Sequence, residues 1–95
     1  MRNGVTLLTE HARVLVCISN HPDWTVRQIA QTLGTSDRQL FRWLNDLQRA
    51  GYLTRMKEGR RNRYLLKPDA SLHEAPVAGA TLSELLHVVA RHPTP

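Results

Sequence analysis

The sequence predicts a small, mainly helical α+β fold with a three-helix core, one β-hairpin and a C-terminal helix. Three observations carry this prediction. Two short segments begin with a helix-capping pattern and end at a glycine, two extended runs flank a Glu-Gly-Arg turn, and the last segment carries an apolar helical stripe. The chain of 95 residues has the length of a single domain.

The first helix is expected from Glu10 to about Asn20. Thr9 can cap its first turn, and His21-Pro22 can end it. Residues 14–18 form an unbroken apolar run. A helix that covers a core on one side needs only an apolar stripe. We therefore expect two faces of this helix to be covered, one of them by a second copy of the chain.

Two further helices are separated by a short turn. Residues 25–28 match a capping box, and the second helix is expected from Val26 to Leu33. Gly34 follows directly and can adopt the left-handed conformation that ends a helix. Residues 36–39 repeat the capping pattern at the start of a third helix over residues 36–50. Two capped helices joined by a glycine turn form a helix-turn-helix.

A change to extended patterning follows the third helix. Residues 52–57 and 61–66 are extended runs on either side of Glu58-Gly59-Arg60. They predict a β-hairpin with a basic tip, placed as a wing over residues 52–66. The fold class is therefore a winged helix-turn-helix with an added C-terminal helix.

The C-terminal part divides into a connection and a helix. Residues 67–80 are rich in Pro, Asp, Ser and Ala without an apolar period, which predicts a linker or a surface loop after a winged helix-turn-helix domain at 1–66. Residues 81–84 match a third capping box, and a helix is expected within 81–92. A helix this short needs its stripe buried, so we expect it to dimerise. The expected interface residues are Val14, Cys17, Ile18, Leu82, Leu85, Leu86 and Val89.

Positive charge is concentrated in the third helix and the hairpin. Between Arg38 and Lys67 the chain carries nine basic and two acidic residues, a formal charge of +7, whereas the remaining residues sum to −2. Clustered positive charge attracts polyanions. A charged helix face by itself is commonly only a solvated surface. Here a basic hairpin follows the charged helix, and the two together favour binding to a nucleic acid. The hairpin carries five cationic residues, more than the protection of an edge strand needs.

The third helix must anchor one face in the core and present the other outward. Arginine pairs with guanine, and glutamine or asparagine with adenine, in the major groove. Base contacts usually come from the N-terminal half of such a helix, which favours Arg38, Gln39 and Arg42. The Ser36 hydroxyl at the helix start suits a phosphate. Phe41 could contact a thymine methyl or pack against the second helix. The candidate recognition residues are Ser36, Arg38, Gln39, Phe41, Arg42 and Asn45.

The hairpin is expected to meet the DNA backbone or to enter the minor groove. Long cationic side chains displace condensed counterions when they reach phosphates. The candidate wing residues are Arg55, Lys57, Arg60, Arg61 and Arg63.

Other kinds of site find little support. Cys17, the only cysteine, lies in an apolar run, so a packed core cysteine is favoured over a redox sensor. The five histidines lack the spacing of metal ligands, so no metal site is expected. The sequence has no phosphate-binding glycine loop, nucleophile elbow or carboxylate cluster, so neither catalytic residues nor a cofactor are expected. No signal segment or long apolar stretch is found, which predicts a cytoplasmic, nucleoid-associated protein without a membrane partner.

Three stretches resemble bacterial winged helix-turn-helix regulators, with MarR-like and ArsR-like proteins closest. They are residues 24–30, Leu33-Gly34 and residues 46–53. The resemblance implies that the second and third helices form the reading head, the hairpin forms the wing and the terminal helices build a dimer. Arg42 matches a frequent arginine of the recognition helix, whereas Phe41 departs from a usually polar position.

The resemblance also bears on the wing and on effectors. Arg60 and Arg61 match the basic wing tip of these families. The chain is shorter than a typical MarR regulator and lacks the long helices of its ligand pocket. It also lacks the cysteine pairs of metal-sensing ArsR proteins. A small-molecule effector is therefore not supported.

The leading hypothesis is a transcriptional regulator, a repressor, that binds double-stranded DNA as a homodimer on a near-palindromic operator. One alternative is a winged helix that binds a protein partner, which would need an apolar recognition face, and only Phe41 fits that description. The other alternative is a non-specific architectural DNA binder, in which the arginine-rich wing dominates and the third helix reads nothing.

Overall fold

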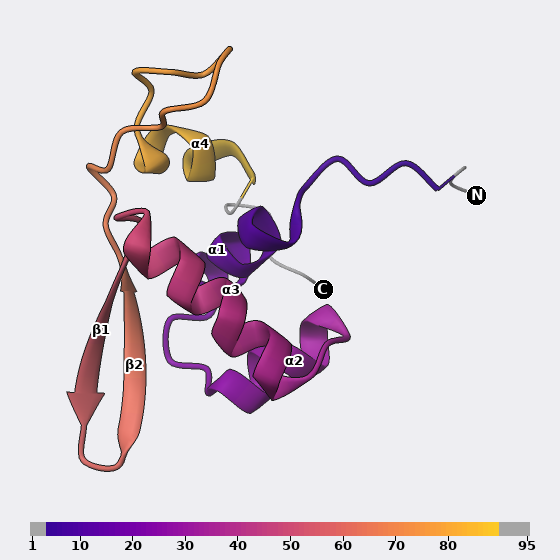
Figure 1. Cartoon of the computed structure of the whole chain (residues 1–95), viewed down its shortest axis with the longest axis vertical. Helices are drawn as coiled ribbons and strands as arrows, with labels where there is room; N and C mark the ends of the chain where they lie inside the picture. Colours follow the sequence, from indigo (N-terminus) through magenta and orange to yellow (C-terminus); the bar gives the residue numbers. More distant parts are fainter. Residues whose placement is uncertain (1–3, 90–95) are drawn as a thin grey trace.

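The structure is a computed structural model that describes residues 4–89 of the chain. Its elements follow in the order α1 (Glu10–Asn20), α2 (Val26–Leu33), α3 (Asp37–Arg49), β1 (Leu53–Glu58), β2 (Arg61–Leu66) and α4 (Leu82–Val89). The three-helix group, the antiparallel hairpin and the C-terminal helix confirm the predicted α+β fold class. The hairpin tip and α4 lie at opposite ends of the molecule (Figure 1).

Local hydrogen bonds place the helix starts where the capping patterns predict them. The Thr25 hydroxyl accepts a bond from the Gln28 N–H at 3.1 Å, and the Gln28 side-chain oxygen accepts one from the Thr25 N–H at 2.8 Å. Thr81 and Glu84 make the same pair of bonds at the start of α4. At α3 the Ser36 hydroxyl accepts from the backbone N–H three residues on, at 3.0 Å. Each cap satisfies a backbone donor that would otherwise lack a partner within the helix.

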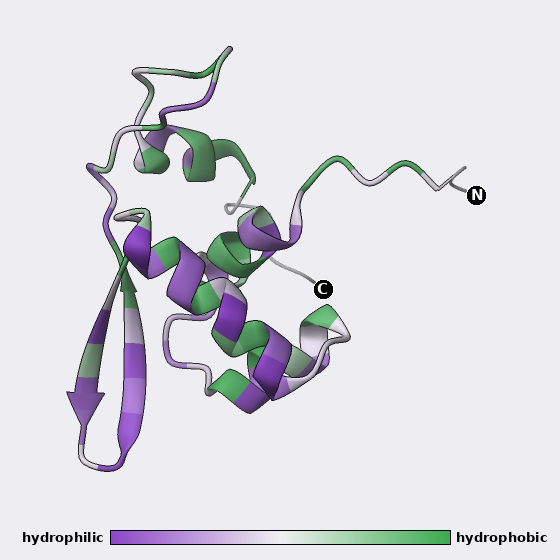
Figure 2. Cartoon of the chain, in the orientation of Figure 1, coloured by the Kyte–Doolittle hydropathy of each residue, from purple (hydrophilic) through white to green (hydrophobic). Residues whose placement is uncertain are grey.

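The core is aliphatic and is organised around α1. This helix packs against α2, α3, β2 and α4. Its side chains meet those of α3, in which Leu40 and Leu44 are fully buried. Hydrophobic residues dominate much of α1 and α4, and hydrophilic residues run along most of the hairpin (Figure 2). The hairpin is therefore anchored at its root and extends beyond the core.

The register of the hairpin divides its side chains between two faces. Leu53 pairs with Leu66, Arg55 with Tyr64, and the strands turn at Gly59-Arg60. Residues opposite each other in an antiparallel pair share a face. Tyr64 and Leu53 are buried, so the face that carries them is the one turned toward the helices.

The segment between β2 and α4 is more structured than a linker. The N–H of Leu72 donates to the Ala80 carbonyl at 2.7 Å, and Ser71 and Thr81 form an isolated β-bridge. Leu72 is buried, and the N–H of Leu82 donates to the Ala70 carbonyl at 2.8 Å. The segment forms a surface loop that ties the start of α4 to the rest of the chain.

The expected interface between copies needs a correction. Such an interface requires faces of α1 and α4 that lack a cover within one chain, but these two helices pack against each other. Five of the expected interface residues lie in the chain's own core: Val14, Cys17, Ile18, Leu82 and Leu86. Of the other two, Val89 packs partly against the same core and Leu85 is 39% exposed. The expected end of the last helix, beyond Val89, lies outside the described residues.

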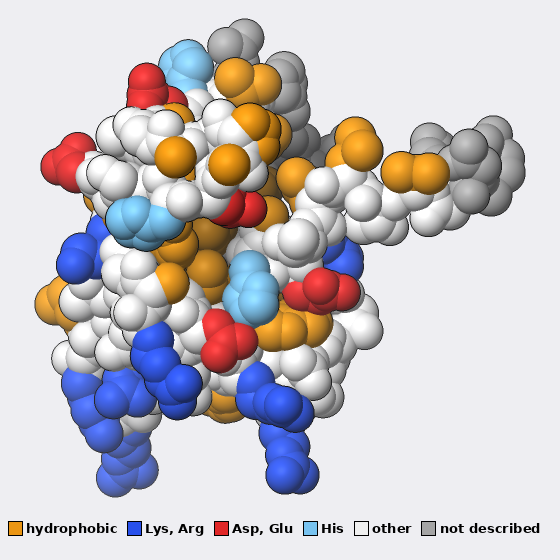
Figure 3. Space-filling model, turned by 45° about the horizontal axis from the view of Figure 1, so that its top comes forward, with side chains coloured by type: hydrophobic (Ala, Val, Ile, Leu, Met, Phe, Trp, Pro, Cys, Tyr) orange, Lys and Arg blue, Asp and Glu red, His pale blue; other side chains and the backbone are white. Residues whose placement is uncertain are grey.

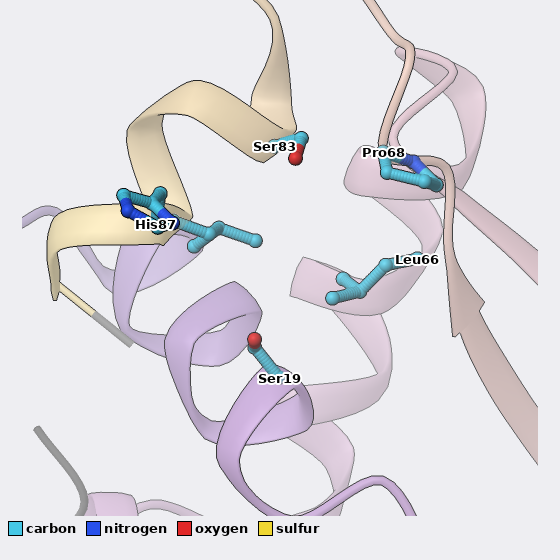
Figure 4. A pocket seen from close by; sticks show the side chains of 6 residues that line it. Ser19, Leu66, Pro68, Ser83 and His87 are labelled. Carbon is cyan, nitrogen blue, oxygen red and sulfur yellow. The ribbon is translucent and has the colours of Figure 1, made fainter. Parts of the chain in front are cut away.

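A hollow of about 220 Å³ remains along the seam between α1 and α4. Figure 4 shows Ser83 and His87 of α4 on one side of it, with Ser19 of α1 and Leu66 at the end of β2 across from them. The hollow lies at the α4 end of the molecule, away from the hairpin tip.

Among residues 4–89, no helix is long and apolar enough to cross a membrane.

Candidate nucleic-acid interface

The outward face of α3 carries most of the predicted recognition residues. Leu40, Leu44 and Leu47 turn into the core and are buried. The opposite side is exposed at Ser36, Arg38, Phe41, Arg42 and Asn45, whereas Gln39 is half-buried. Burial of one leucine stripe thus fixes which polar side chains face solvent.

The exposed stripe continues past the predicted residues to the end of α3. Gln48 and Arg49 follow Asn45 at helical spacings of three and four residues, and both are exposed. Arg49 was expected on the outward face of the helix, but neither residue was among the candidate recognition residues, which favour the N-terminal half of the helix. The spacing from Asn45 was the signal in the sequence that could have found them.

The two carboxylates of α3, Asp37 and Asp46, lie close to charged or titratable side chains of α2 and α1. The Arg27 guanidinium of α2 lies 3.7 Å from the Asp37 carboxylate in the first turn of α3. On the flank of α3, the Asp46 carboxylate lies 2.9 Å from the imidazole Nε2 of His11 on α1. Both α3 carboxylates therefore already have partners within the chain.

The five predicted wing residues do not share one face of the hairpin. Arg55 and Lys57 lie on the face of Tyr64, turned toward the helices, whereas Arg61 and Arg63 lie on the other face. Arg60 occupies the turn. All five are exposed. A duplex that approaches from one side would therefore meet only part of the set at a time.

Two local interactions involve arginines of the wing, Arg63 and Arg55. The Arg63 guanidinium lies 3.3 Å from the Glu58 carboxylate, so the acidic residue of the hairpin forms an exposed ion pair with a neighbouring arginine. Burial raises the pKa of the Tyr64 phenol, and the adjacent Arg55 guanidinium offsets part of that rise. Arg55 therefore lies close above a buried side chain, which places it near the root of the wing.

A trough separates α3 from the hairpin. Its volume is about 360 Å³, and it is lined by Asn45, Gln48, Arg49 and Arg55, four residues from α3 and β1. We call it the α3–β1 trough. It brings two of the predicted candidates, Asn45 and Arg55, together with Gln48 and Arg49, which were not among the candidate recognition residues.

The electrostatic character of the molecule differs between its ends. In Figure 3, Lys and Arg side chains gather at the lower end of the view, and the opposite end shows hydrophobic, acidic and histidine side chains. The basic end carries the hairpin and the ends of α2 and α3. This surface suits a polyanion.

A helix-turn-helix followed by a basic hairpin defines the winged helix-turn-helix class of DNA-binding proteins. The model of the MarR family matches residues 3–63, more than half of the chain, and the chain therefore belongs to the MarR family. Members of this family are DNA-binding transcriptional regulators, and this is the function of the chain at that level. Neither curated proteins nor solved structures give a significant match. The resemblance to ArsR-like proteins stays a prediction.

Proposed function

We propose that this regulator is a sequence-specific repressor that binds a near-palindromic operator as a homodimer, within the cytoplasm and at the nucleoid. The observation that carries the proposal is the exposed face of α3. Arg38, Arg42 and Asn45 are residue types that pair with base edges, and they stand on the solvent side of a helix whose other side is anchored by buried leucines. The basic wing adds affinity for the backbone without reading sequence.

Two points support a dimer. MarR regulators usually bind DNA as dimers. In addition, Val5 and Leu7 before α1 and Leu85 and Val88 on α4 are exposed apolar side chains, and they belong to neither α3 nor the wing. We assign these side chains to the contact between the two copies. A symmetric dimer would place two α3 helices about 34 Å apart, one turn of DNA.

Repression would follow from occupancy. A dimer seated on two successive half-sites covers promoter DNA that a polymerase also needs. A reporter gene placed behind such a site should be expressed less when the protein is present, and expression should recover with a variant that binds DNA poorly.

Selection from a random duplex library tests sequence specificity. We expect the wild-type protein to enrich a motif with two inverted half-sites, because two α3 helices related by a two-fold axis read the same bases on opposite strands. Arg42→Ala should enrich a more degenerate motif. Binding without any enriched motif would contradict the proposal and favour an architectural binder, and failure to bind duplex DNA would favour a protein-interaction module.

A further inference from the structure

The α3–β1 trough is lined by hydrogen-bond donors without an acidic side chain. Asn45 and Gln48 carry amide N–H groups, and Arg49 and Arg55 carry guanidinium groups. The nearest carboxylate along α3, Asp46, lies on the flank of the helix within 2.9 Å of His11. Asp46 is therefore not part of the trough lining.

Secondary structure fixes the two walls. Asn45, Gln48 and Arg49 lie at i, i+3 and i+4 on one side of α3, and all are exposed. Arg55 is opposite the buried Tyr64 in the hairpin register, so it lies on the hairpin face that is turned toward the helices. Donors from two different elements thus converge on one space.

The position of the trough defines what could fill it. With α3 in the major groove and the wing at the adjacent minor groove, the sugar-phosphate strand that separates the two grooves must run between α3 and the hairpin. The trough is the space between these elements. Guanidinium and amide N–H groups are the donors that bind phosphate oxygens in protein–DNA interfaces.

We infer that the α3–β1 trough binds the phosphodiester strand between the two grooves, with Gln48 and Arg49 as DNA contacts in addition to the predicted Asn45 and Arg55. The inference rests on the proposed DNA binding, but it needs neither a dimer nor a particular operator. In this arrangement the C-terminal half of α3 contacts the DNA sugar-phosphate backbone, while the N-terminal half faces the bases.

A purely structural role for these residues predicts different behaviour. Arg49 lies in the last turn of α3, where a cation also favours the helix dipole. Loss of that role would lower thermal stability, yet it would leave the salt dependence of DNA binding unchanged. The salt slope therefore separates the two roles.

The test measures the affinity for a duplex of arbitrary sequence by fluorescence anisotropy over a range of salt concentrations. Arg49→Ala should weaken binding and lower the slope of log K against log salt by about 1, because one phosphate contact is lost. Gln48→Ala should weaken binding by about five-fold with an unchanged slope, because an uncharged hydrogen bond is lost. Arg49→Lys should keep the wild-type slope. Thermal melts of each variant check that it is folded.

A matched control removes the same charge elsewhere. Lys67 is exposed directly after β2 and does not line the trough, so Lys67→Ala should leave the slope unchanged. The trough assignment would be overturned if Arg49→Ala kept the wild-type salt slope and Gln48→Ala kept the wild-type affinity. If Arg61→Ala still weakened binding in the same experiment, the proposed function would stand. A wild-type protein that binds no duplex at all would overturn both.

Discussion

Arg42 and Arg61 carry the same charge at positions that a duplex meets differently. Arg42 is exposed on the outward face of α3, and Arg61 is exposed on the hairpin. We expect Arg42→Ala to cost about 1–3 kcal/mol on the preferred site and to relax sequence choice, because a base contact is lost. Arg61→Ala should weaken all sequences alike and lower the salt slope by about 1. Titrations on an enriched duplex and a scrambled one measure both effects, and equal behaviour of the two variants on both duplexes would contradict the assignment.

Gly34 allows the tight turn between α2 and α3. Its φ of +71° lies in the left-handed region, and a Cβ built there would meet nothing within 4 Å. Gly34→Ala should therefore destabilise the fold by about 1–2 kcal/mol through backbone strain alone. Gly34→Asn should cost less, since asparagine tolerates this region better. Urea denaturation measures the change, and an alanine variant as stable as the wild type would contradict this explanation.

Cys17 illustrates a residue whose chemistry is suppressed by its surroundings. It is buried in α1, and burial raises the pKa of its thiol. At neutral pH the thiolate is therefore scarce as well as shielded. Iodoacetamide should modify the folded protein slowly and the urea-unfolded protein quickly. Equally fast modification of the two forms would indicate an accessible, reactive thiol.

Residue-level prediction works where the determining contacts are local. The caps at Thr9, Thr25 and Thr81 depend on groups three residues apart, and all three form as the sequence indicates. The capping box expected at Ser36 is only half-formed, because the return bond from the Gln39 side chain is not among the hydrogen bonds of residues 4–89. The α3–β1 trough escaped prediction because it exists only when β1 folds back beside α3.

At the scale of elements, periodicity predicts that a stripe is buried but not what buries it. The apolar runs of α1 and α4 indicate covered faces, and the structure covers them with each other. The long loop between β2 and α4 makes this contact possible, because it returns the chain to α1. The same apolar stripes are equally compatible with burial against a second copy, so the sequence alone does not distinguish the two kinds of cover.

The docking of α4 is tested by two leucines on the same helix. Leu82 is 0% exposed and Leu85 is 39% exposed. Leu82→Ala should destabilise the protein by about 2–5 kcal/mol, because it opens a cavity in the core. Leu85→Ala, the matched control, should cost less than about 1 kcal/mol at protein concentrations at which the chain is monomeric. Urea denaturation of both variants measures the difference, and equal losses would contradict the observed orientation of α4.

At the scale of the whole molecule, two surfaces are separated. The basic end carries α3 and the wing, whereas α4 lies at the other end (Figures 1 and 3). The exposed Val88 on α4, at 61%, is therefore remote from the wing tip. Contacts between two copies at the α4 end would leave the basic ends of both copies uncovered.

Footprinting on a duplex enriched from the random library tests the central claim, that the protein reads an operator with two symmetric α3 helices. We predict two protected half-sites, related by a two-fold axis, with centres about 34 Å apart along one face of the DNA. Arg42→Ala should lose this footprint at protein concentrations where the wild type gives it. Protection of a single half-site, or protection without sequence boundaries, would contradict the claim.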